Sequence, residues 1–333
     1  MKKAYLYCDK RSLNDATNYY LNIVNSCLTK LGYEVIVVYH LNEIVKPNLI
    51  FTITVFTFIK AKLRYPLVKT LSWRQGLGLE EAKLNRPIYK WIPYWFFELF
   101  TIQLSDVVLF VSEEMRDYYQ KKFFYKKNNH VIMPCYNLHI GENFDVKRYN
   151  SPTFVYAGGI SKWQSIDTLL DTYSYIEKAI PSAKLVMYAK EKEYLFQECS
   201  KRGIKNIEVK YVSLDQLQQE LQTYKYGFIL REKNWVNYVA TPTKMNSYLA
   251  AYLIPIFSDG VNDFERHINL EDFKIMARTP LNPKMIAQQI LDFENSKHDF
   301  SKFKFLVESI FDKHYNDSKY LSLILKKMKE CGF

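Results

Sequence analysis

The chain has 333 residues, which is enough for two domains of ordinary size. Its 48% hydrophobic and 24% charged residues are typical of a folded globular protein and exclude a largely disordered one. The formal net charge of +11 suits nucleic acid, anionic lipid or phosphorylated ligands. No nucleic-acid motif accompanies the charge, so we expect no nucleic-acid partner, and most lysines are expected to form a solvated surface.

The cysteines and histidines indicate neither disulfides nor a metal site. Five cysteines have no pairing or metal spacing, which favours a reduced, cytoplasmic compartment. Six histidines show no ligand spacing, so we expect no metal and no cofactor. The first apolar run is too short for a signal peptide, and the longest, 49–59, is about half of a membrane span. We therefore expect a cytoplasmic protein, either soluble or peripheral on the inner face of the plasma membrane.

Strands and helices are predicted to alternate through both halves of the chain. Uninterrupted apolar runs such as 107–111 are typical of parallel strands buried on both faces. Ser112 is a predicted N-cap for a helix that reaches Phe123. In the first half we expect strands at 4–8, 35–38, 49–54, 68–72, 107–111 and 130–133, and a helix at 15–31. In the second half we expect strands at 153–156, 185–188, 207–211, 227–230 and 254–258, with helices at 165–178, 191–201, 214–223, 242–251 and after Pro283.

This alternation predicts an α/β protein with two doubly wound domains facing a cleft. Residues 137–150 lose the periodicity and are the predicted linker. We place the first domain at 1–150 and the second at 151–312, and we expect 313–333 to form a helix that packs back toward the first domain. Ligands bind beyond the carboxyl ends of strands in such sheets, so the cleft is the expected site.

Three motifs of the second half are candidates for binding an anion. Gly158, Gly159, Ser161 and Lys162 lie between a predicted strand and helix, where backbone N–H groups and a cation can meet phosphate; the alternative is a tight turn with a solvated lysine. Arg231 follows the strand 227–230 and can hold phosphate oxygens, or can be a surface arginine paired with an acid.

The third motif is the start of the helix predicted at 242–251. Thr241 is the predicted N-cap and Pro242 the first helical residue. Thr243, Lys244 and Ser247 share one face of that helix because they lie three or four residues apart. The alternative is an ordinary, well-capped helix with a polar side.

Two stretches of the first half are also candidates. Gln75, Gly76, Glu80 and Glu81 follow a predicted strand and could contact a sugar, unless the acids only begin a helix. The segment 87–104 is unusually aromatic and is preceded by basic residues. It could contact an anionic membrane surface or a lipid-diphosphate acceptor, and the alternative is a buried helix.

Together these stretches resemble the family-four glycosyltransferases of capsule, cell-wall and lipopolysaccharide biosynthesis. Residues 154–163 match that family's strand, Gly-Gly and Lys pattern, and 242–255 match its Pro-Thr-Lys helix and following strand. Gln75-Gly76 with Glu80-Glu81 is similar to a loop of some members. The resemblance implies a GT-B fold with two Rossmann-like domains.

The resemblance also implies a metal-independent, retaining hexosyl-type transfer from a nucleotide-diphosphate sugar to a glycan or lipid-linked glycan. Lys162 and Arg231 would be catalytic and would stabilise the leaving diphosphate. Gly158, Gly159, Ser161, Thr241, Pro242, Thr243, Lys244 and Ser247 would bind the donor, and Gln75, Gly76, Glu80 and Glu81 the acceptor.

The sequence departs from the family pattern at the position that usually holds the donor's ribose. Ser247 stands where the family has Glu, and Val239 stands where a partner acid is expected. A serine cannot hold both ribose hydroxyls as a carboxylate can, so a deoxynucleotide donor loses less from the change. The competing interpretation is a weakened GT-B-like protein that binds sugar or nucleotide without turnover. A Rossmann oxidoreductase would need a G-x-G-x-x-G turn, and the chain has none.

Overall fold

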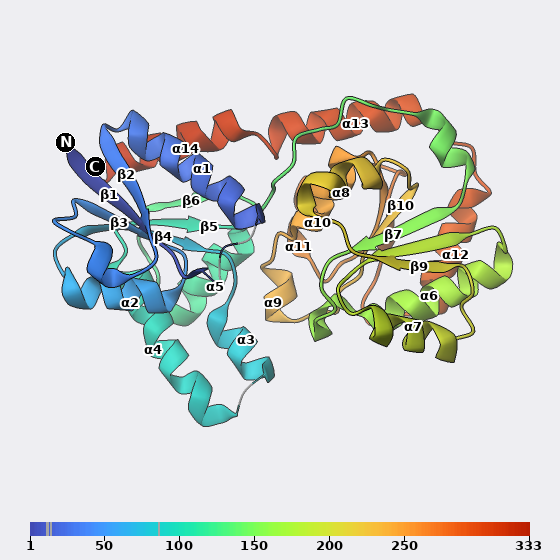
Figure 1. Cartoon of the computed structure of the whole chain (residues 1–333), viewed down its shortest axis with the longest axis horizontal. Coiled ribbons are helices and arrows are strands. Elements are labelled where there is room, and N and C mark those ends of the chain that lie inside the picture. The colour runs from blue at the N-terminus through green and yellow to red at the C-terminus, as the bar shows by residue number, and fades with distance from the viewer. Residues whose placement is uncertain (11–12, 14, 86) are drawn as a thin grey trace. The chain divides into compact units, whose positions relative to one another are not determined.

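The computed structural model describes residues 1–10, 13, 15–85 and 87–333 of the chain (Figure 1). The chain divides into two compact units. The first contains Met1–Asn137, Val239–Thr241 and Asn316–Phe333, and the second contains Leu138–Tyr238 and Pro242–Tyr315. The chain thus leaves the first unit at Asn137, before the predicted domain limit at residue 150, and its last residues belong to the first unit.

The first unit is built on a parallel six-stranded sheet of order β2-β1-β3-β4-β5-β6. Its strands are β1 (Lys2–Tyr7), β2 (Tyr33–Val38), β3 (Leu49–Thr52), β4 (Lys69–Arg74), β5 (Val107–Phe110) and β6 (His130–Ile132). Its helices are α1 (Asp15–Lys30), α2 (Val55–Arg64), α3 (Gly78–Asn85), α4 (Ile88–Leu104), α5 (Glu113–Phe123) and α14 (Asp317–Glu330). Helices cover both faces of this sheet (Figure 1), so every residue of β3 and β5 is buried, as the apolar runs predict.

Capping explains where two helices of this unit begin. The Ser112 hydroxyl accepts a hydrogen bond from the Met115 N–H at 3.0 Å, which confirms the predicted N-cap of α5. The Thr54 hydroxyl caps α2 in the same way, from the Thr57 N–H at 3.2 Å. The sequence pattern does not indicate α2, because its apolar residues continue the run of β3 and obscure the cap at Thr54.

The second unit contains the other parallel six-stranded sheet, of order β12-β11-β10-β7-β8-β9. Its strands are β7 (Thr153–Ala157), β8 (Lys184–Tyr188), β9 (Ile207–Lys210), β10 (Tyr226–Ile229), β11 (Ile254–Ser258) and β12 (Ile275–Ala277). Its helices are α6 (Ile166–Ala179), α7 (Lys192–Lys201), α8 (Leu214–Leu221), α9 (Trp235–Tyr238), α10 (Thr243–Ala250), α11 (Asn262–His267), α12 (Pro283–Glu294) and α13 (Phe300–Lys313). Short 3₁₀ turns lie at Leu41–Glu43, Val146–Asn150 and Lys162–Gln164. The doubly wound α/β class predicted from the sequence is therefore correct for both units.

The strand order of the second unit determines where a ligand can bind. Successive strands run outward in one direction from β7 to β9 and in the other direction from β10 to β12. The order reverses between β7 and β10, which are paired in the middle of the sheet. In open parallel sheets this reversal leaves a crevice beyond the carboxyl ends of the two strands. The loops after Ala157 and Ile229 therefore begin at that crevice.

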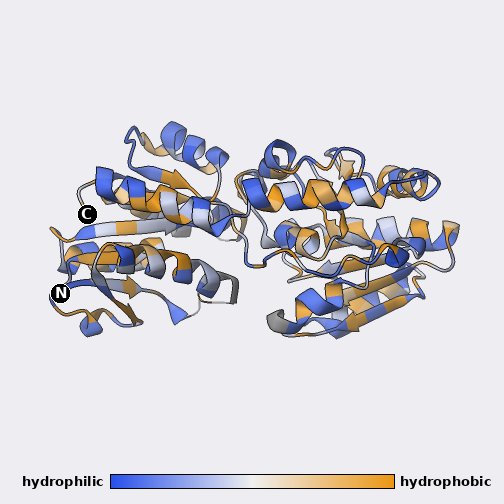
Figure 2. Cartoon of the chain, turned by 90° about the horizontal axis from the view of Figure 1, so that it is seen from above, coloured by the Kyte–Doolittle hydropathy of each residue, from blue (hydrophilic) through white to orange (hydrophobic). Residues whose placement is uncertain are grey.

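Amphipathic helices complete the core of each unit, and Figure 2 shows hydrophobic and hydrophilic residues alternating along them. In the first unit the C-terminal helix α14 packs on α1, where Cys27 Sγ lies 3.8 Å from Met328 Sδ. The Lys69 ammonium donates to the Cys331 carbonyl at 3.2 Å and lies 4.6 Å from the centre of the Phe333 ring. No helix among the described residues is long and apolar enough to cross a membrane.

One close packing contact in the second unit gives a prediction about stability. A Cβ added at Gly227 of β10 would lie 2.3 Å from Cδ2 of Tyr248, which is fully buried on α10. We expect Gly227→Ala to lower the free energy of unfolding by about 1–3 kcal/mol, because the ring cannot move without repacking the core. Urea denaturation measures this change. Gly159→Ala is the matched control, since a Cβ there meets nothing within 4 Å. Equal losses in the two variants would contradict the packing argument.

Candidate anion site in the second unit

The loop after β7 begins with Gly158, and the side chain of Lys244 passes close to it. Gly158 has a φ of +141°, and its N–H donates to the Tyr188 carbonyl at 3.0 Å. A Cβ on Gly158 would lie 2.6 Å from Cε of Lys244, so a side chain here would displace the end of that lysine, and the positive φ itself favours glycine. The Lys244 ammonium also lies 5.1 Å from the centre of the Tyr156 ring, within the range of a cation–π contact. These contacts hold the ammonium group of Lys244 beside the glycine loop.

A second cation, Arg231, shares a hydrogen-bond acceptor with Lys244, and that acceptor is the neutral side-chain amide of Gln164. Gln164 Oε1 accepts hydrogen bonds from Lys244 Nζ at 3.1 Å and from Arg231 Nη2 at 3.4 Å. Within the described part of the chain, no carboxylate lies within 4.0 Å of either cation. The amide carries no net charge, so the two positive charges are brought together without being neutralised.

Arg231 is buried, with 6% of its surface exposed. Its Nη1 donates to the Asn237 side-chain oxygen at 3.2 Å, while its buried Nε has no hydrogen-bond partner. The backbone after β10 is fixed because the Arg231 N–H donates to Ser258 Oγ at 2.8 Å and that hydroxyl donates to the Arg231 carbonyl. A buried guanidinium with an unpaired N–H and no carboxylate is suited to an anionic ligand.

Burial shifts the pKa values of both cations in the same direction. It lowers the pKa of the Lys244 ammonium to about 7, with a further contribution from the neighbouring Arg231. It lowers the pKa of the Arg231 guanidinium to about 10. The protein therefore holds positive charge here at a cost in solvation, and a bound anion would reduce that cost.

Lys162 and Ser161 are on the same loop but are exposed. Lys162 begins the 3₁₀ turn Lys162–Gln164, and no carboxylate of the described residues lies within 4.0 Å of it. Ser165, which follows the turn, has a φ of +48° and redirects the chain into α6. Arg231 and Lys162 are the two cations that the family resemblance makes catalytic, whereas the structure joins Arg231 to Lys244 through Gln164. Gln164 and Asn237 were missed, because a neutral amide outside any charged motif gives no signal in the sequence.

The start of α10 differs from its prediction. The helix begins at Thr243 with Pro242 as its N-cap residue, and Pro242 makes no side-chain capping bond. The buried Thr241 hydroxyl does not cap the helix and accepts a hydrogen bond from the Cys135 N–H at 2.9 Å. The predicted cap at Thr241 is therefore wrong, because a backbone donor of another segment competes for its oxygen. The first turn is consequently left without side-chain capping.

Ser247 and Val239 lie inside the protein. The Ser247 hydroxyl donates to the Thr243 carbonyl at 3.1 Å, four residues earlier on the same helix, and 6% of the residue is exposed. Val239 is buried, and its carbonyl accepts from the Ser112 hydroxyl. Thr243 and Pro242 are half-buried. Ser247 stands where the family that the sequence resembles has Glu, and its hydroxyl thus already has a hydrogen-bond partner within the helix.

The predicted acceptor loop lies in the first unit, after β4. Oε1 of Glu80 accepts from Tyr118 Oη at 2.5 Å, from Lys83 at 3.3 Å and from Lys122. Burial raises the pKa of Glu80, but the hydrogen bonds from Lys122 and Tyr118 outweigh it and leave the pKa below its ordinary value. This carboxylate therefore helps to hold α3 against α5.

Gln75, Gly76 and Glu81 are placed differently from Glu80. Oε1 of Glu81 would lie 2.6 Å from a Cβ on Gly76, so the carboxylate closely approaches the loop backbone. Burial, and then the charge of Glu98, raise the pKa of Glu81. Nε2 of Gln75 is buried without a hydrogen-bond partner, which leaves a donor available in this loop.

The buried ion pair of Arg74 and Glu98 lies at the end of β4. Arg74 Nη2 and Glu98 Oε2 are 2.8 Å apart, and the Tyr119 hydroxyl donates to the same oxygen at 2.5 Å. Arg74 Nε donates to the Tyr119 oxygen at 3.2 Å. The pair joins β4, α4 and α5, so it determines how α4 is oriented on the unit.

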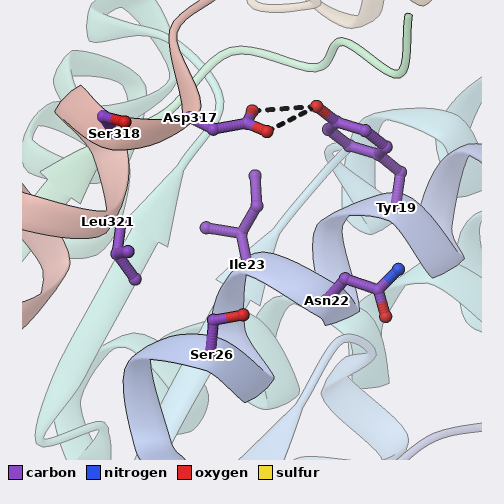
Figure 3. Close-up of a pocket in the computed structure, with 7 residues that line it drawn as sticks. All are labelled: Tyr19, Asn22, Ile23, Ser26, Asp317, Ser318 and Leu321. Carbon is purple, nitrogen blue, oxygen red and sulfur yellow. Dashed lines mark hydrogen bonds between the residues drawn. The ribbon is translucent and has the colours of Figure 1, made fainter. Parts of the chain in front are cut away.

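A hollow of about 190 Å³ also lies in the first unit, between α1 and α14 (Figure 3). The Tyr19 hydroxyl donates to both carboxylate oxygens of Asp317 across its rim, at 2.9 and 2.7 Å. Its lining consists of Tyr19, Asn22, Ile23, Ser26, Asp317, Ser318 and Leu321. The hollow is smaller than sites that hold cofactors or nucleotides, and it contains none of the predicted site residues. Among the described residues, no group of three or more His, Cys, Asp or Glu side chains is arranged to hold a metal ion.

Comparison with known proteins gives no sequence relative but many structural ones. No protein-family model and no curated protein matches the sequence. Sucrose-phosphate synthase from Thermosynechococcus elongatus matches 99% of this chain and 98% of its own, with 12% identity and a TM-score of 0.70. WaaG, a glycosyltransferase involved in lipopolysaccharide biosynthesis, matches 97% of this chain and 99% of its own, with 9% identity and a TM-score of 0.65.

The chain has the GT-B fold. A mutant of S. aureus TarM in complex with fondaparinux, α-GlcNAc-glycerol and UDP shares this fold, with 13% identity and a TM-score of 0.62. That match covers 85% of this chain but only 55% of TarM, so the chain spans about half of that protein. At such low identities the likeness establishes the GT-B fold alone. What the GT-B fold does in this chain depends on its own residues.

The lowered pKa of Lys244 gives a prediction about stability and pH. A lysine has a pKa near 10.4 in an unfolded chain, so between about pH 7 and that value the unfolded state binds more protons than the folded state. The free energy of unfolding should therefore rise with pH across this window, by up to about 1.4 kcal/mol per unit. Lys244→Met removes this contribution. We expect the wild type to gain stability relative to Lys244→Met from pH 7 to pH 9 in urea denaturation, and parallel curves would contradict the burial of the charge.

Proposed function

We propose that the chain is a glycosyltransferase that moves a sugar from a nucleoside-diphosphate donor to a glycan or lipid-diphosphate-linked acceptor in surface-polysaccharide synthesis. The observation that carries this proposal is the pair Arg231 and Lys244, two cations without a carboxylate partner that share Gln164 Oε1. They lie after β10 and on α10, beside the glycine loop after β7, where the strand order reverses. A diphosphate supplies the negative charge that this pair lacks.

Each residue of the site has a proposed role. Arg231 and Lys244 hold the diphosphate and stabilise the charge that develops on it as the sugar leaves. Gly159 is open, since a Cβ there would meet nothing within 4 Å, so the donor can approach its backbone closely. Lys162 and Ser161 are exposed beside it and would contact the donor from the solvent side. The structural relative TarM was solved with UDP, which agrees with a nucleoside-diphosphate donor here.

We propose a retaining, metal-independent hexosyl transfer. The two fixed cations supply the positive charge that a divalent ion supplies in other transferases. The departing phosphate oxygen then takes the proton of the acceptor hydroxyl, so no separate general base is needed. No organic cofactor enters this scheme, because the donor itself provides the leaving group.

In the first unit we propose that Gln75, Gly76 and Glu81 contact the acceptor. Nε2 of Gln75 is a buried donor without a partner, and Glu81 is a half-buried carboxylate next to Gly76. Glu80 takes a positioning role instead, since its Oε1 already accepts from Tyr118, Lys83 and Lys122. We also propose that the acceptor is used at the inner face of a membrane, which the protein reaches from the cytoplasm as a peripheral protein.

The test is a donor screen with variants of the cation pair. Common nucleotide sugars are scanned by thermal shift and by hydrolysis of the sugar–phosphate bond. We expect Arg231→Gln and Lys244→Met each to lower the turnover of the preferred donor by about a hundredfold or more, because a preorganised charge on the diphosphate is lost.

Arg278→Ala is the matched control for this screen. Arg278 is a 63% exposed arginine of the same unit that pairs with Glu265, so turnover should not change. A preferred donor that binds but is never hydrolysed or transferred would instead support a sugar- or nucleotide-binding protein. Failure of every nucleotide sugar to bind would overturn the proposed function.

Ser247 gives a prediction about the nucleotide. Its hydroxyl already donates to the Thr243 carbonyl, and it offers no carboxylate to hold two ribose hydroxyls. A deoxyribose lacks one of these hydroxyls and loses less from the missing carboxylate. We therefore expect thymidine diphosphate to raise the melting temperature at least as much as uridine or guanosine diphosphate. A clear preference for either ribonucleotide would show that another group holds the ribose.

A further inference from the structure

Helix α4 exposes an apolar face along its whole length. Ile88, Tyr89, Ile92, Phe96, Phe100 and Leu104 are each between 46% and 64% exposed. They recur every three or four residues, so they form one continuous strip on the helix, which we call the α4 apolar face. The sequence of α4 contains only two charged residues, Lys90 and Glu98, and Glu98 is buried. A water-facing helix surface of this composition is exceptional in a soluble protein.

The opposite face of α4 is fully engaged, so the helix cannot turn its apolar face inward. The Phe56 ring of α2 packs edge-on against Tyr94 and Phe97, with ring centres 5.3 and 5.5 Å away. Glu98 is fixed by its ion pair with Arg74 at 2.8 Å. Figure 1 shows α3 and α4 reaching away from the sheet of the first unit. The strip is therefore held outward by the core behind it.

The segment that contains the α4 apolar face is rich in basic residues. Residues 55–104 contain eight basic and three acidic residues, a net charge of +5. The three acidic side chains make contacts within the first unit. Glu98 pairs with Arg74, and Glu80 pairs with Lys83 and Lys122. The carboxylate of Glu81 lies next to Gly76. Lys62 and Arg74 are also paired with acids, Asp106 at 3.8 Å and Glu98 at 2.8 Å, so only some of these basic side chains contribute unpaired positive charge to the surface.

Two cations of α2 continue the strip. Lys60 and Arg64 are exposed and have no carboxylate within 4.0 Å in the described part of the chain. Helical spacing places them on the same side of α2 as Phe56, which touches α4, and Leu63, which is 81% exposed. Apolar and cationic side chains thus alternate on one side of α2, next to the apolar strip of α4.

We propose that the α4 apolar face, with Lys60 and Arg64, binds the surface of an anionic lipid bilayer. A helix with an apolar strip beside lysine and arginine lies in the plane of the lipid headgroups, where the strip enters the acyl boundary and the cations meet acidic headgroups. The half-buried Trp91 and Trp95 suit this boundary, because their rings are apolar and their N–H groups are polar. A second copy of the chain fits less well, because a two-fold contact would bring the cations of both copies together.

This inference rests on the peripheral membrane location in the proposed function and names the surface that would contact the lipid. The test measures binding of the full chain to vesicles in the absence of any nucleotide, so its failure is distinguishable from failure of the donor screen. Vesicles of phosphatidylcholine with phosphatidylglycerol are sedimented at low salt, beside vesicles of phosphatidylcholine alone. We expect the protein to sediment with the anionic vesicles and to be released as salt is raised. Binding to neither kind of vesicle would overturn the proposal.

Two variants and one control locate the surface. Phe96→Ser with Phe100→Ser should weaken binding by about tenfold or more, because two inserted rings are lost. The control is Phe196→Ser with Phe305→Ser, two rings of the second unit that are 46% and 69% exposed. Lys60→Glu with Arg64→Glu should weaken binding to a similar degree and leaves the apolar residues in place. Melting temperatures show that each variant is folded.

The remaining outcomes decide against the lipid surface. If both α4 and α2 variants bind vesicles as tightly as the wild type, some other part of the chain meets the lipid. Light scattering of the same samples tests the other occupant. A wild-type dimer that Phe96→Ser with Phe100→Ser converts to a monomer, with vesicle binding unchanged, would assign the face to a second copy of the chain.

Discussion

The sharing of one neutral amide by two cations determines the chemistry of the second unit. Gln164 accepts from Arg231 and from Lys244, and no described carboxylate neutralises them. Burial makes two such neighbouring charges unfavourable, which is why both pKa values lie below their ordinary range. The surrounding residues are arranged to permit the pair, since Gly158 leaves room for the lysine and Asn237 accepts from the guanidinium. Two such neighbouring cations are unfavourable on their own. A bound anion would lower this cost because it supplies the opposite charge.

The buried arginine of the first unit, Arg74, has a carboxylate partner, unlike Arg231. Arg74 is paired with Glu98 and hydrogen-bonded to Tyr119, so its charge has a carboxylate partner within the protein, while its Nη1, like Nε of Arg231, is buried without a hydrogen-bond partner. Breaking such a pair leaves an uncompensated buried charge, at a cost of about 3–5 kcal/mol. The pair therefore fixes the orientation of α4 rather than binding a ligand. The same parallel-sheet architecture thus places the proposed anion site after β10 in one unit and a structural ion pair after β4 in the other.

The sequence predicts the elements of the sheets well, because buried parallel strands need uninterrupted apolar runs such as 107–111. It also identifies Gly158 and Arg231 as candidates, since a glycine and a cation directly after strands carry a clear signal. It does not show that Lys244, rather than Lys162, lies beside Arg231, because that depends on how α10 packs against the loop. Nor does it identify Gln164, a neutral side chain that matters only through the two groups it joins.

One error and one alternative that the sequence leaves open have the same origin. Thr241 has the composition of a helix cap, but its hydroxyl accepts from the Cys135 N–H, which lies more than a hundred residues away in the sequence. The aromatic segment 87–104 is as compatible with a buried helix as with a surface one, until the contacts of α2 and the pairing of Glu98 show which side faces inward. Long-range competition for a hydrogen bond or a packing surface is not encoded in local spacing.

The ionisation of Lys244 has a consequence for how the proposed donor would bind. A guanidinium remains charged in water at any physiological pH, so Arg231 is buried as a cation. Lys244 is half-buried, and its pKa falls to about 7, so near neutral pH its charged and neutral forms coexist. A diphosphate beside this lysine would favour the charged form. Binding of the proposed donor would therefore be coupled to the uptake of a proton.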